Sequence, residues 1–371
     1  MLLLEVLYYI FIVVFCFQLG YYLLIFGQFT RIKLAANVTN NLPPVSVIIC
    51  AKNEAENLKT FLPSIIAQQY PVFELVLIND ASYDHTWDVM ENFSEQHPNV
   101  KLVNVKNTEA FWANKKYALT LGIKAATYNH LLFTDADCQP ISENWILEMA
   151  GHFSAQKSIV LGYGAYQKIK GSLLNKLIRF ETLFTALQYL SFAKIGMPYM
   201  GVGRNLAYTK EDFFRVSGFM KHMHIRSGDD DLFINEIANK HNTSLCISEN
   251  SITVSVPKKT FSDWVKQKRR HITTAQHYKA GHKVLLALFY ISQVCFWLLA
   301  ILLLSFLVHW QLVLSAILLR FACQYLIIWH TAKKLKENDL VLLAPFFELF
   351  LVIFQFIIFT TNILSKPKHW K

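Results

Sequence analysis

Long apolar stretches occupy both ends of this 371-residue chain and leave a polar segment of mixed charge, residues 31–283, between them. The first stretch runs from Leu2 to Phe26 with Glu5 as its only charge, which is too long for the apolar part of a signal peptide and typical of a membrane anchor. Three further stretches are candidate spans: Val284–Val308, Leu312–Trp329 and Val341–Leu364. We therefore expect an integral membrane protein with an N-terminal anchor, residues 1–30, and a C-terminal membrane region of two or three spans, residues 284–371.

The formal net charge of +10 comes from Lys and Arg residues that gather beside the apolar stretches. These clusters are Arg31 with Lys33, Lys266 to Arg270, and Lys333, Lys334 and Lys336. Short basic flanks favour the cytoplasmic side of a bilayer, so we expect the central segment to be cytoplasmic. Nucleic-acid binding is not expected, because the chain lacks a basic recognition helix, a recognition motif and an aromatic-rich strand face. Six scattered cysteines without a CxxC pair indicate a reducing compartment.

Strands and helices alternate through the first half of the central segment. The expected strands are Val45–Ala51, Phe73–Ile78, Lys101–Val105 and the apolar run that begins at His130. The expected helices pass through Leu58 to Ile66, Thr86 to about Glu95, and Trp112 to Ala126. This alternation predicts βαβ units and a mostly parallel central sheet, the α/β architecture common to nucleotide-binding domains.

Acidic residues close two of these expected strands. Asp80 follows the strand that ends at Ile78, and Asp135 and Asp137 follow the strand that begins at His130. Ligands bind at the carboxyl ends of parallel strands, and two carboxylates across a turn can share a hard divalent cation. The alternative is an Asp-rich turn that caps the next helix. Two acidic strand ends on one sheet favour a shared site over two separate turns.

A third group of acids and a basic segment lie later in the chain. Asp229, Asp230 and Asp231 precede an amphipathic helix, and three adjacent acids exceed what helix capping needs. Their mutual repulsion would raise the pKa of one of them, as a general base requires. The segment Ser262–His271 contains four cationic residues and is either a membrane-flanking patch or a set of cations that stabilises a departing diphosphate.

In this order, the elements resemble the membrane-bound members of glycosyltransferase family 2, inverting enzymes with a GT-A fold, over about residues 44–275. The resemblance rests on an ordered set of short motifs rather than on any one of them. The segments are Val45–Glu54 as first strand and Asn-Glu turn, Asn79–Asp84 for Asp-Asp-Gly-Ser-x-Asp, Asn114–Gly122 for Gly-Lys…Ala-Leu-Asn-x-Gly, Asp135–Asp137 for Asp-x-Asp, Gly228–Asp230 for Gly-Glu-Asp, and Gln267–His271 for Gln-x-x-Arg-Trp. Asn79, Ala81, Asn114 and His271 depart from the family pattern.

The resemblance implies a role for each matching position on the donor side. Asp80 would contact the base or ribose of a nucleotide sugar, with Asp84 supporting that loop. Lys115 would lie near the uridine diphosphate. Asp135 and Asp137 would hold a divalent cation, Mg²⁺ or Mn²⁺, against the diphosphate.

On the acceptor side, the resemblance implies that Asp230 is the general base, with Asp229 as the alternative. Gln267 and Arg270 would bind the acceptor or the diphosphate at the membrane surface, and we assign His271 and Asn205 to the same group. One base and no nucleophile implies a single displacement with inversion at the sugar.

Two features outside these motifs allow more than one interpretation. The apolar stripe from Leu173 to Lys194, within residues 172–195, predicts either a core helix or a helix on the bilayer surface, and its length and aromatic content favour the surface. Arg320 and Glu348 lie inside apolar stretches, where they would either pair with each other or, for Arg320, attract a lipid phosphate.

These observations predict a cytoplasmic glycosyltransferase domain, residues 31–283, that moves a sugar from a nucleotide sugar to a lipid or membrane-proximal glycan in the making of a cell-envelope glycan or glycolipid. Few spans, and His271 in place of an aromatic acceptor-stacking residue, favour the addition of one sugar. The alternatives are a short processive polysaccharide synthase of the same family and a transport or scaffold protein with an inactive nucleotide-binding domain.

Overall fold

A seven-stranded sheet in the order β3-β2-β1-β4-β8-β6-β9 forms the centre of the α/β part of the computed structural model, which describes residues 2–34, 42–106, 115–225 and 227–365. The strands are β1 (Val45–Ala51), β2 (Phe73–Asp80), β3 (Val100–Val105), β4 (His130–Phe133), β6 (Ile159–Leu161), β8 (Leu206–Thr209) and β9 (Thr243–Leu245). β1 pairs in parallel with β2 and β4, β2 with β3, and β6 with β9, whereas β8 runs antiparallel to β4 and β6. The predicted mostly parallel α/β sheet is confirmed.

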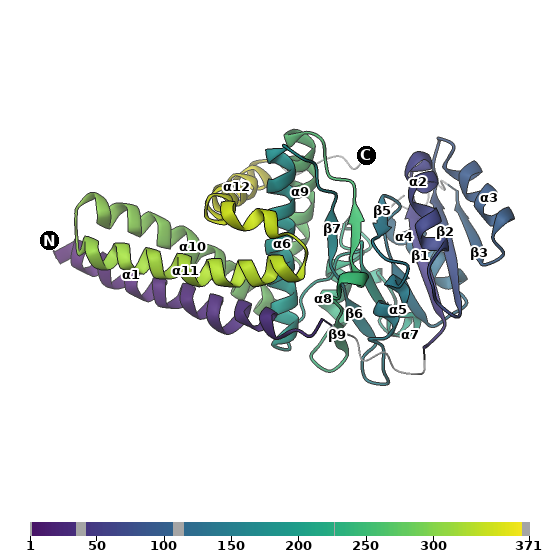
Figure 1. Cartoon of the computed structure of the whole chain (residues 1–371), viewed down its shortest axis with the longest axis horizontal. Helices are drawn as coiled ribbons and strands as arrows, with labels where there is room; N and C mark the ends of the chain where they lie inside the picture. The colour runs from purple at the N-terminus through teal and green to yellow at the C-terminus, as the bar shows by residue number, and fades with distance from the viewer. Residues whose placement is uncertain (1, 35–41, 107–114, 226, 366–371) are drawn as a thin grey trace.

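Helices cover this sheet (Figure 1). They are α2 (Ala55–Ile66), α3 (Thr86–Gln96), α4 (Lys115–Ala125), α5 (Trp145–Ala150), α7 (Lys210–Arg215) and α8 (Asp231–Ile237). In α2, for example, Leu58, Leu62 and Ile65 are buried against the sheet. The motif residue Asn114 and the expected start of α4 at Trp112 lie outside the described residues. A second sheet, of β5 (Cys138–Pro140), β10 (Thr253–Ser255) and β7 (Gly164–Tyr166), continues directly from the acidic end of β4.

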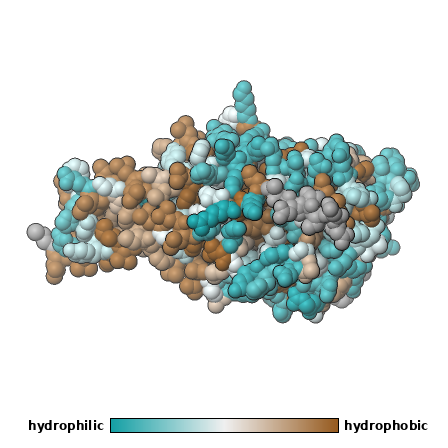
Figure 2. Space-filling model, turned by 60° about the horizontal axis from the view of Figure 1, so that its bottom comes forward, coloured by the Kyte–Doolittle hydropathy of each residue, from teal (hydrophilic) through white to brown (hydrophobic). Residues whose placement is uncertain are grey.

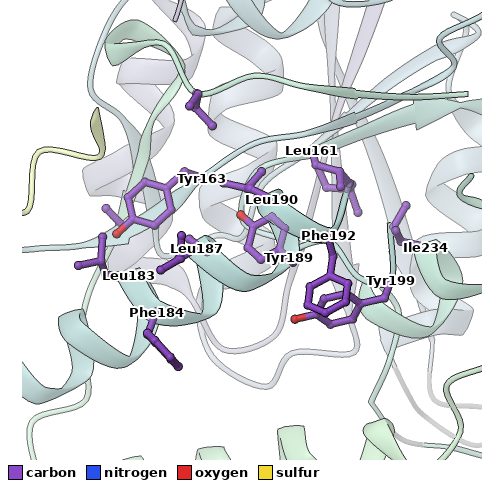
Figure 3. Packing of buried hydrophobic residues seen from close by; sticks show 14 of the residues in the cluster. Leu161, Tyr163, Leu183, Phe184, Leu187, Tyr189, Leu190, Phe192, Tyr199 and Ile234 are labelled. Atoms are coloured by element: carbon purple, nitrogen blue, oxygen red, sulfur yellow. The ribbon is translucent and has the colours of Figure 1, made fainter. Parts of the chain in front are cut away.

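The helix α6 (Leu173–Lys194) is a core helix, which corrects the expectation that it lies on a bilayer surface. Apolar residues on several of its sides are buried against protein, and Figure 3 shows Leu187 and Leu190 of α6 beside Tyr163. Phe180 packs against Phe347, and Phe184 against Phe26, so the opposite side of α6 meets the apolar helices near the two chain ends. A helix on a bilayer surface and a helix packed against apolar helices carry the same apolar stripe, so the sequence pattern does not distinguish the two.

Among the residues that the structure describes, four helices are long and apolar enough to cross a membrane. The helical elements of this region are α1 (Leu2–Gly20), continued by η1 (Tyr21–Ile25) and η2 (Phe26–Arg31), then α10 (Ala280–Ser305), α11 (Trp310–Lys334), η5 (Asn338–Leu343) and α12 (Ala344–Leu364). α1, α10 and α11 lie side by side and extend away from the sheet, while α12 runs across them near the α/β part and packs on α6 and on α9 (Phe261–Ala275) (Figure 1). The surface of the bundle is predominantly apolar (Figure 2).

Candidate active site

The parallel pairing of β1, β2 and β4 brings the ends of these strands to one edge of the sheet. Asp80 is the last residue of β2 and is buried, and burial raises the pKa of its carboxyl. The turn after β1 is bonded to the turn after β2: Asn53 Oδ1 accepts from the Tyr83 amide at 3.0 Å, and Asp84 Oδ2 accepts from the Ala55 amide at 3.4 Å. Asp84 therefore helps to hold the two turns together.

Lys115, the first residue of α4, joins two acidic segments that are distant in the sequence. Its ammonium lies 2.8 Å from Asp135 Oδ1 and 3.1 Å from Asp229 Oδ2. Burial disfavours this charge, but the two carboxylates outweigh burial and hold the pKa of Lys115 well above its ordinary value. With Asp230 and Gly203 beside them, these residues line one small cavity. The structure thus brings together Lys115, Asp135 and the acids at the start of α8, as the motifs predict.

Asp135 and Asp137 present carboxylate oxygens that fit a hard divalent cation. One potential ligand atom from each of Asp135, Asp137 and Cys138 lies within 4.8 Å of the others. Burial and the negative charge of Asp135 raise the pKa of Asp137, whereas at Asp135 burial is outweighed by Lys115 together with Arg204 and Arg270, so the pKa of Asp135 is lowered. The Cys138 thiol donates to Asp137 Oδ1 at 3.4 Å, and burial raises its pKa, so the donor set is two carboxylates and a protonated thiol. Such a set suits Mg²⁺ or Mn²⁺ better than a thiolate-binding metal.

The three acids before and at the start of α8 have three different environments. Asp229 is paired with Lys115, and Asp231 accepts hydrogen bonds from the hydroxyls of Thr274 and Tyr278, the latter at 2.7 Å. Asp230 accepts from the backbone amides of Gly203, at 2.7 Å, and Asp231. Burial, then the charges of Asp229 and Asp231, raise the pKa of Asp230 to about 7. Of these three carboxyls, Asp230 is therefore the one whose pKa suits proton transfer near neutral pH.

The helix α9 carries Gln267, Arg270 and His271 toward this cluster. Gln267 Nε2 donates to the Tyr166 hydroxyl at 3.4 Å, and the charge of Arg270 is felt by the carboxyl of Asp135. His271 is exposed to solvent. α9 also packs against α12, where the Trp264 ring stacks on Phe354. α9 therefore links the neighbourhood of the acids to the apolar helix α12.

Asn205 is not brought to the cluster. It is fully buried, its amide nitrogen donates to the carbonyls of Tyr163 and Ser251, and its amide oxygen accepts from the Trp145 indole at 3.0 Å. These three hydrogen bonds join the start of β8 to three other segments of the fold, so the role of Asn205 is structural. Its neighbour Arg204, and not Asn205, lies near the acid cluster.

Arg204 and Lys116 are the site residues that the sequence analysis missed. The Arg204 guanidinium lies 4.2 Å from the centre of the Tyr166 ring, and its charge is felt by both Asp135 and Asp137. Lys116 is buried, and its ammonium donates to the carbonyls of His222 and Ile225, which fixes the segment that leads to the acids of α8. The glycines on either side of Val202 mark the loop that carries Arg204, and the signal for Lys116 is only its position next to Lys115.

The chain is similar to known proteins in its sequence and in its fold. A family model described as glycosyl transferase family 2 matches residues 46–219. The chain is 30% identical over 109 residues to a poly-beta-1,6-N-acetyl-D-glucosamine synthase of Staphylococcus epidermidis, which covers 29% of this chain and 25% of that protein. It is 29% identical over 133 residues to the 4,4'-diaponeurosporenoate glycosyltransferase of Staphylococcus aureus, covering 36% of this chain and 34% of that protein. The aligned segments thus span a quarter to a third of these relatives.

A solved structure extends the likeness to nearly the whole chain. The mannosyltransferase PcManGT from Pyrobaculum calidifontis, in complex with GDP-Man and Mn²⁺, superposes with a TM-score of 0.58 and 19% identity over 91% of this chain and 97% of that one. At this identity the likeness concerns the fold. Residues 46–219 therefore match the glycosyl transferase family 2 model, the chain shares the fold of this mannosyltransferase, and within its described residues four helices are apolar enough to span a membrane.

Proposed function

We propose that the protein is an inverting glycosyltransferase that moves a sugar from a nucleotide sugar, with a UDP-sugar as first choice, to a lipid or membrane-proximal glycan. The observation that carries the proposal is the separation of two kinds of acid in one cluster. Asp135 and Asp137 form a charged pair that fits a cation, while Asp230 has a pKa of about 7 and accepts hydrogen bonds only from backbone amides among the described residues. Displacement of a nucleoside diphosphate by a hydroxyl needs both: charge neutralisation on the leaving group and a base for the acceptor.

On the donor side, Asp80 at the end of β2 would bind the base or ribose. Lys115 and Arg204 would hold the diphosphate, since both are cations placed beside Asp135. Asp135 and Asp137 would hold a divalent cation, which when bound neutralises charge on the diphosphate. Nucleotide-sugar binding also agrees with the name of the superposed mannosyltransferase structure, which contains GDP-Man and Mn²⁺.

On the acceptor side, Asp230 would remove the proton of the attacking hydroxyl as the oxygen bonds to the anomeric carbon and the bond to the diphosphate breaks. A single attack opposite the leaving group inverts the configuration of that carbon. Gln267, Arg270 and His271 would hold the acceptor, because they lie on α9, which brings Arg270 near the acids and packs against the apolar helix α12. The relative named for 4,4'-diaponeurosporenoate as its acceptor agrees with an apolar acceptor here.

We further propose that the domain is cytoplasmic and that α12 lies along the membrane surface instead of crossing the bilayer. The two ends of α12 lie beside the same α/β part: Asp339, just before it, pairs with Arg179 of α6, and Asn362 at its end bonds to Arg269 of α9. At the far end of the bundle, His309 lies 3.1 Å from Glu5. Reporter fusions at both termini should place the C-terminus on the cytoplasmic side and the N-terminus on the other.

The test of the activity is purified protein in detergent, incubated with a panel of UDP- and GDP-sugars, with Mg²⁺, Mn²⁺ or EDTA, and with a membrane lipid extract as acceptor source. Metal-dependent nucleotide release, with one sugar added to each lipid, is the expected result. The proposal fails if no donor is turned over and Asp137→Ala binds nucleotide as tightly as the wild type does.

A further inference from the structure

A second cavity, with a volume of about 670 Å³, lies away from the acid cluster at the β6–β9 edge of the sheet. Four segments that are far apart in the sequence meet there: the end of η2, the C-terminal end of α6, the segment before β6 and the segment before β9. Each contributes basic side chains, which are Arg31, Lys33, Lys157, Lys194 and Lys240. Among the described residues, no Asp or Glu lines this cavity.

These five charges are not neutralised by the protein. Within the described parts of the chain none of the five forms an ion pair, whereas Lys168 and Arg179, near the other end of α6, are both paired with Asp339. Lys157 instead donates to the carbonyl of Lys240 at 2.9 Å, which brings two of the cationic segments together. Several cations around one cavity repel each other and raise the local concentration of anions, so an anionic ligand is favoured there.

The cationic segment after η2 is held in a fixed position. The Lys334 ammonium donates to the carbonyls of Thr30, at 2.8 Å, and Ile32, at 2.7 Å. These two residues flank Arg31 and precede Lys33, so the backbone that carries both cavity cations is tied to the end of α11. A preformed arrangement of cations binds an anion with a smaller loss of entropy than mobile side chains do.

The position of the cavity identifies the source of the ligand. The apolar stretch of the first membrane helix ends at Arg31, and Ala193 and Lys194, at the end of α6, line the same cavity. Figure 2 shows strongly hydrophilic residues on this face, where the apolar helices meet the α/β part. At the end of an apolar helix long enough to cross a bilayer, the nearest anions are lipid headgroups. We propose that the cavity binds the headgroup of an anionic phospholipid from the leaflet in which η2 ends.

The test uses delipidated full-length protein in detergent, titrated with dioctanoyl phosphatidylglycerol and followed by native mass spectrometry. The changed variant is Lys157→Gln with Lys240→Gln, and its matched control is Lys59→Gln with Lys124→Gln, which removes two charges from α2 and α4. One phosphatidylglycerol per protein is expected, and the cavity variant should bind it about 30-fold more weakly, at about fivefold for each charge lost near a lipid headgroup. The control variant should bind it as the wild type does.

Three comparisons decide the result. Lys157→Arg with Lys240→Arg keeps the charges and should retain the binding, so a loss equal to that of the Gln variant would show that charge is not the cause and overturn the proposal. Equal binding of dioctanoyl phosphatidylcholine would overturn it as well. Displacement of phosphatidylglycerol by inorganic phosphate at equal concentration would assign the cavity to a free anion and not to a lipid. No sugar transfer is measured, so these outcomes are independent of the proposed catalytic function.

Discussion

Charged side chains are buried both in the helical bundle and in the acid cluster, and their pairing differs between the two regions. In the helical bundle, Arg320 of α11 contacts Glu348 of α12, with Arg320 Nη1 and Glu348 Oε2 3.2 Å apart. Glu348 also accepts from Tyr22 at 3.0 Å and from Gln293 at 2.9 Å, and Arg320 donates to Gln18 at 3.1 Å. Opposite charges are matched and their remaining hydrogen-bonding groups are occupied. This confirms the predicted pair and places it between four helices.

In the acid cluster the charges are not matched. Lys115 is shared between Asp135 and Asp229, while Asp80, Asp137 and Asp230 keep raised pKa values because burial outweighs the cations near them. An unmatched buried carboxylate reduces stability, so its presence is better explained by ligand binding or proton transfer. The paired charges of the bundle join helices to one another, whereas the unpaired carboxylates of the acid cluster are available to a ligand. This comparison makes four predictions.

The largest effect is expected for Asp137→Asn. It removes a negative charge that would hold the divalent cation against the diphosphate. Sugar transfer should fall by about 10⁴-fold, since metal-ion stabilisation of the leaving group is worth several kcal/mol. Initial rates of transfer measure it. The melting temperature should stay the same or rise, because an unmatched buried charge has been removed. A variant that keeps more than a tenth of the activity would place the leaving-group site elsewhere.

The next effect is expected for Asp230→Asn, which leaves the acceptor hydroxyl without a base. Transfer should fall by about 10³-fold, within the range that general-base catalysis contributes. Nucleotide-sugar binding, measured by calorimetry, should remain, which separates this variant from Asp137→Asn. Asp229→Asn is the matched comparison: if it loses the larger share of transfer while donor binding is kept, Asp229 is the base.

Much of this division could be predicted from the sequence, because strand ends and motif order place Asp80, Asp135, Asp137 and the three acids of α8 at one edge of a sheet. The sequence did not show how three adjacent acids differ. Thr274 and Tyr278, which donate hydrogen bonds to Asp231, lie more than forty residues later in the sequence. Only the folded chain therefore shows that Asp231 joins α8 to the segment that contains them.

The wrong expectations have a similar cause. Periodicity shows that a residue lies on an apolar face or in a loop, but it does not show what lies opposite. Asn205 points into the protein, while the charge of Arg204, next to it, acts on the carboxyls of Asp135 and Asp137. α6 carries the apolar stripe of a surface helix and meets the other apolar helices instead of lipid.

The third prediction concerns the bundle. Arg320→Met leaves Glu348 buried without its cation, and the free energy of unfolding should fall by about 3 kcal/mol. Chemical or thermal denaturation in detergent measures this. Sugar transfer per folded molecule should be unchanged, because Arg320 touches no part of the acid cluster.

The matched control for this variant is Arg320→Met with Glu348→Leu, which removes both charges and should recover most of the lost stability. Loss of transfer with unchanged stability would reverse the assignment and make the bundle charges functional. Gln324, one turn further along α11, is a buried amide without a hydrogen-bond partner among the described residues. Gln324→Leu should therefore be neutral or stabilising, unlike the single Arg320 variant.

The smallest effect is on the pH dependence of transfer. A base must be ionised, and the pKa of Asp230 is raised to about 7 by burial and by the charges of Asp229 and Asp231, against the opposing charge of Lys115. Transfer should therefore rise about tenfold per pH unit below pH 7 and level off above it, as for any single base. Asp231→Asn removes one of the charges that raise this pKa, so the midpoint should move to lower pH, while Lys115→Met should move it to higher pH. A midpoint near pH 4 in the wild type would mean that Asp230 is not the base.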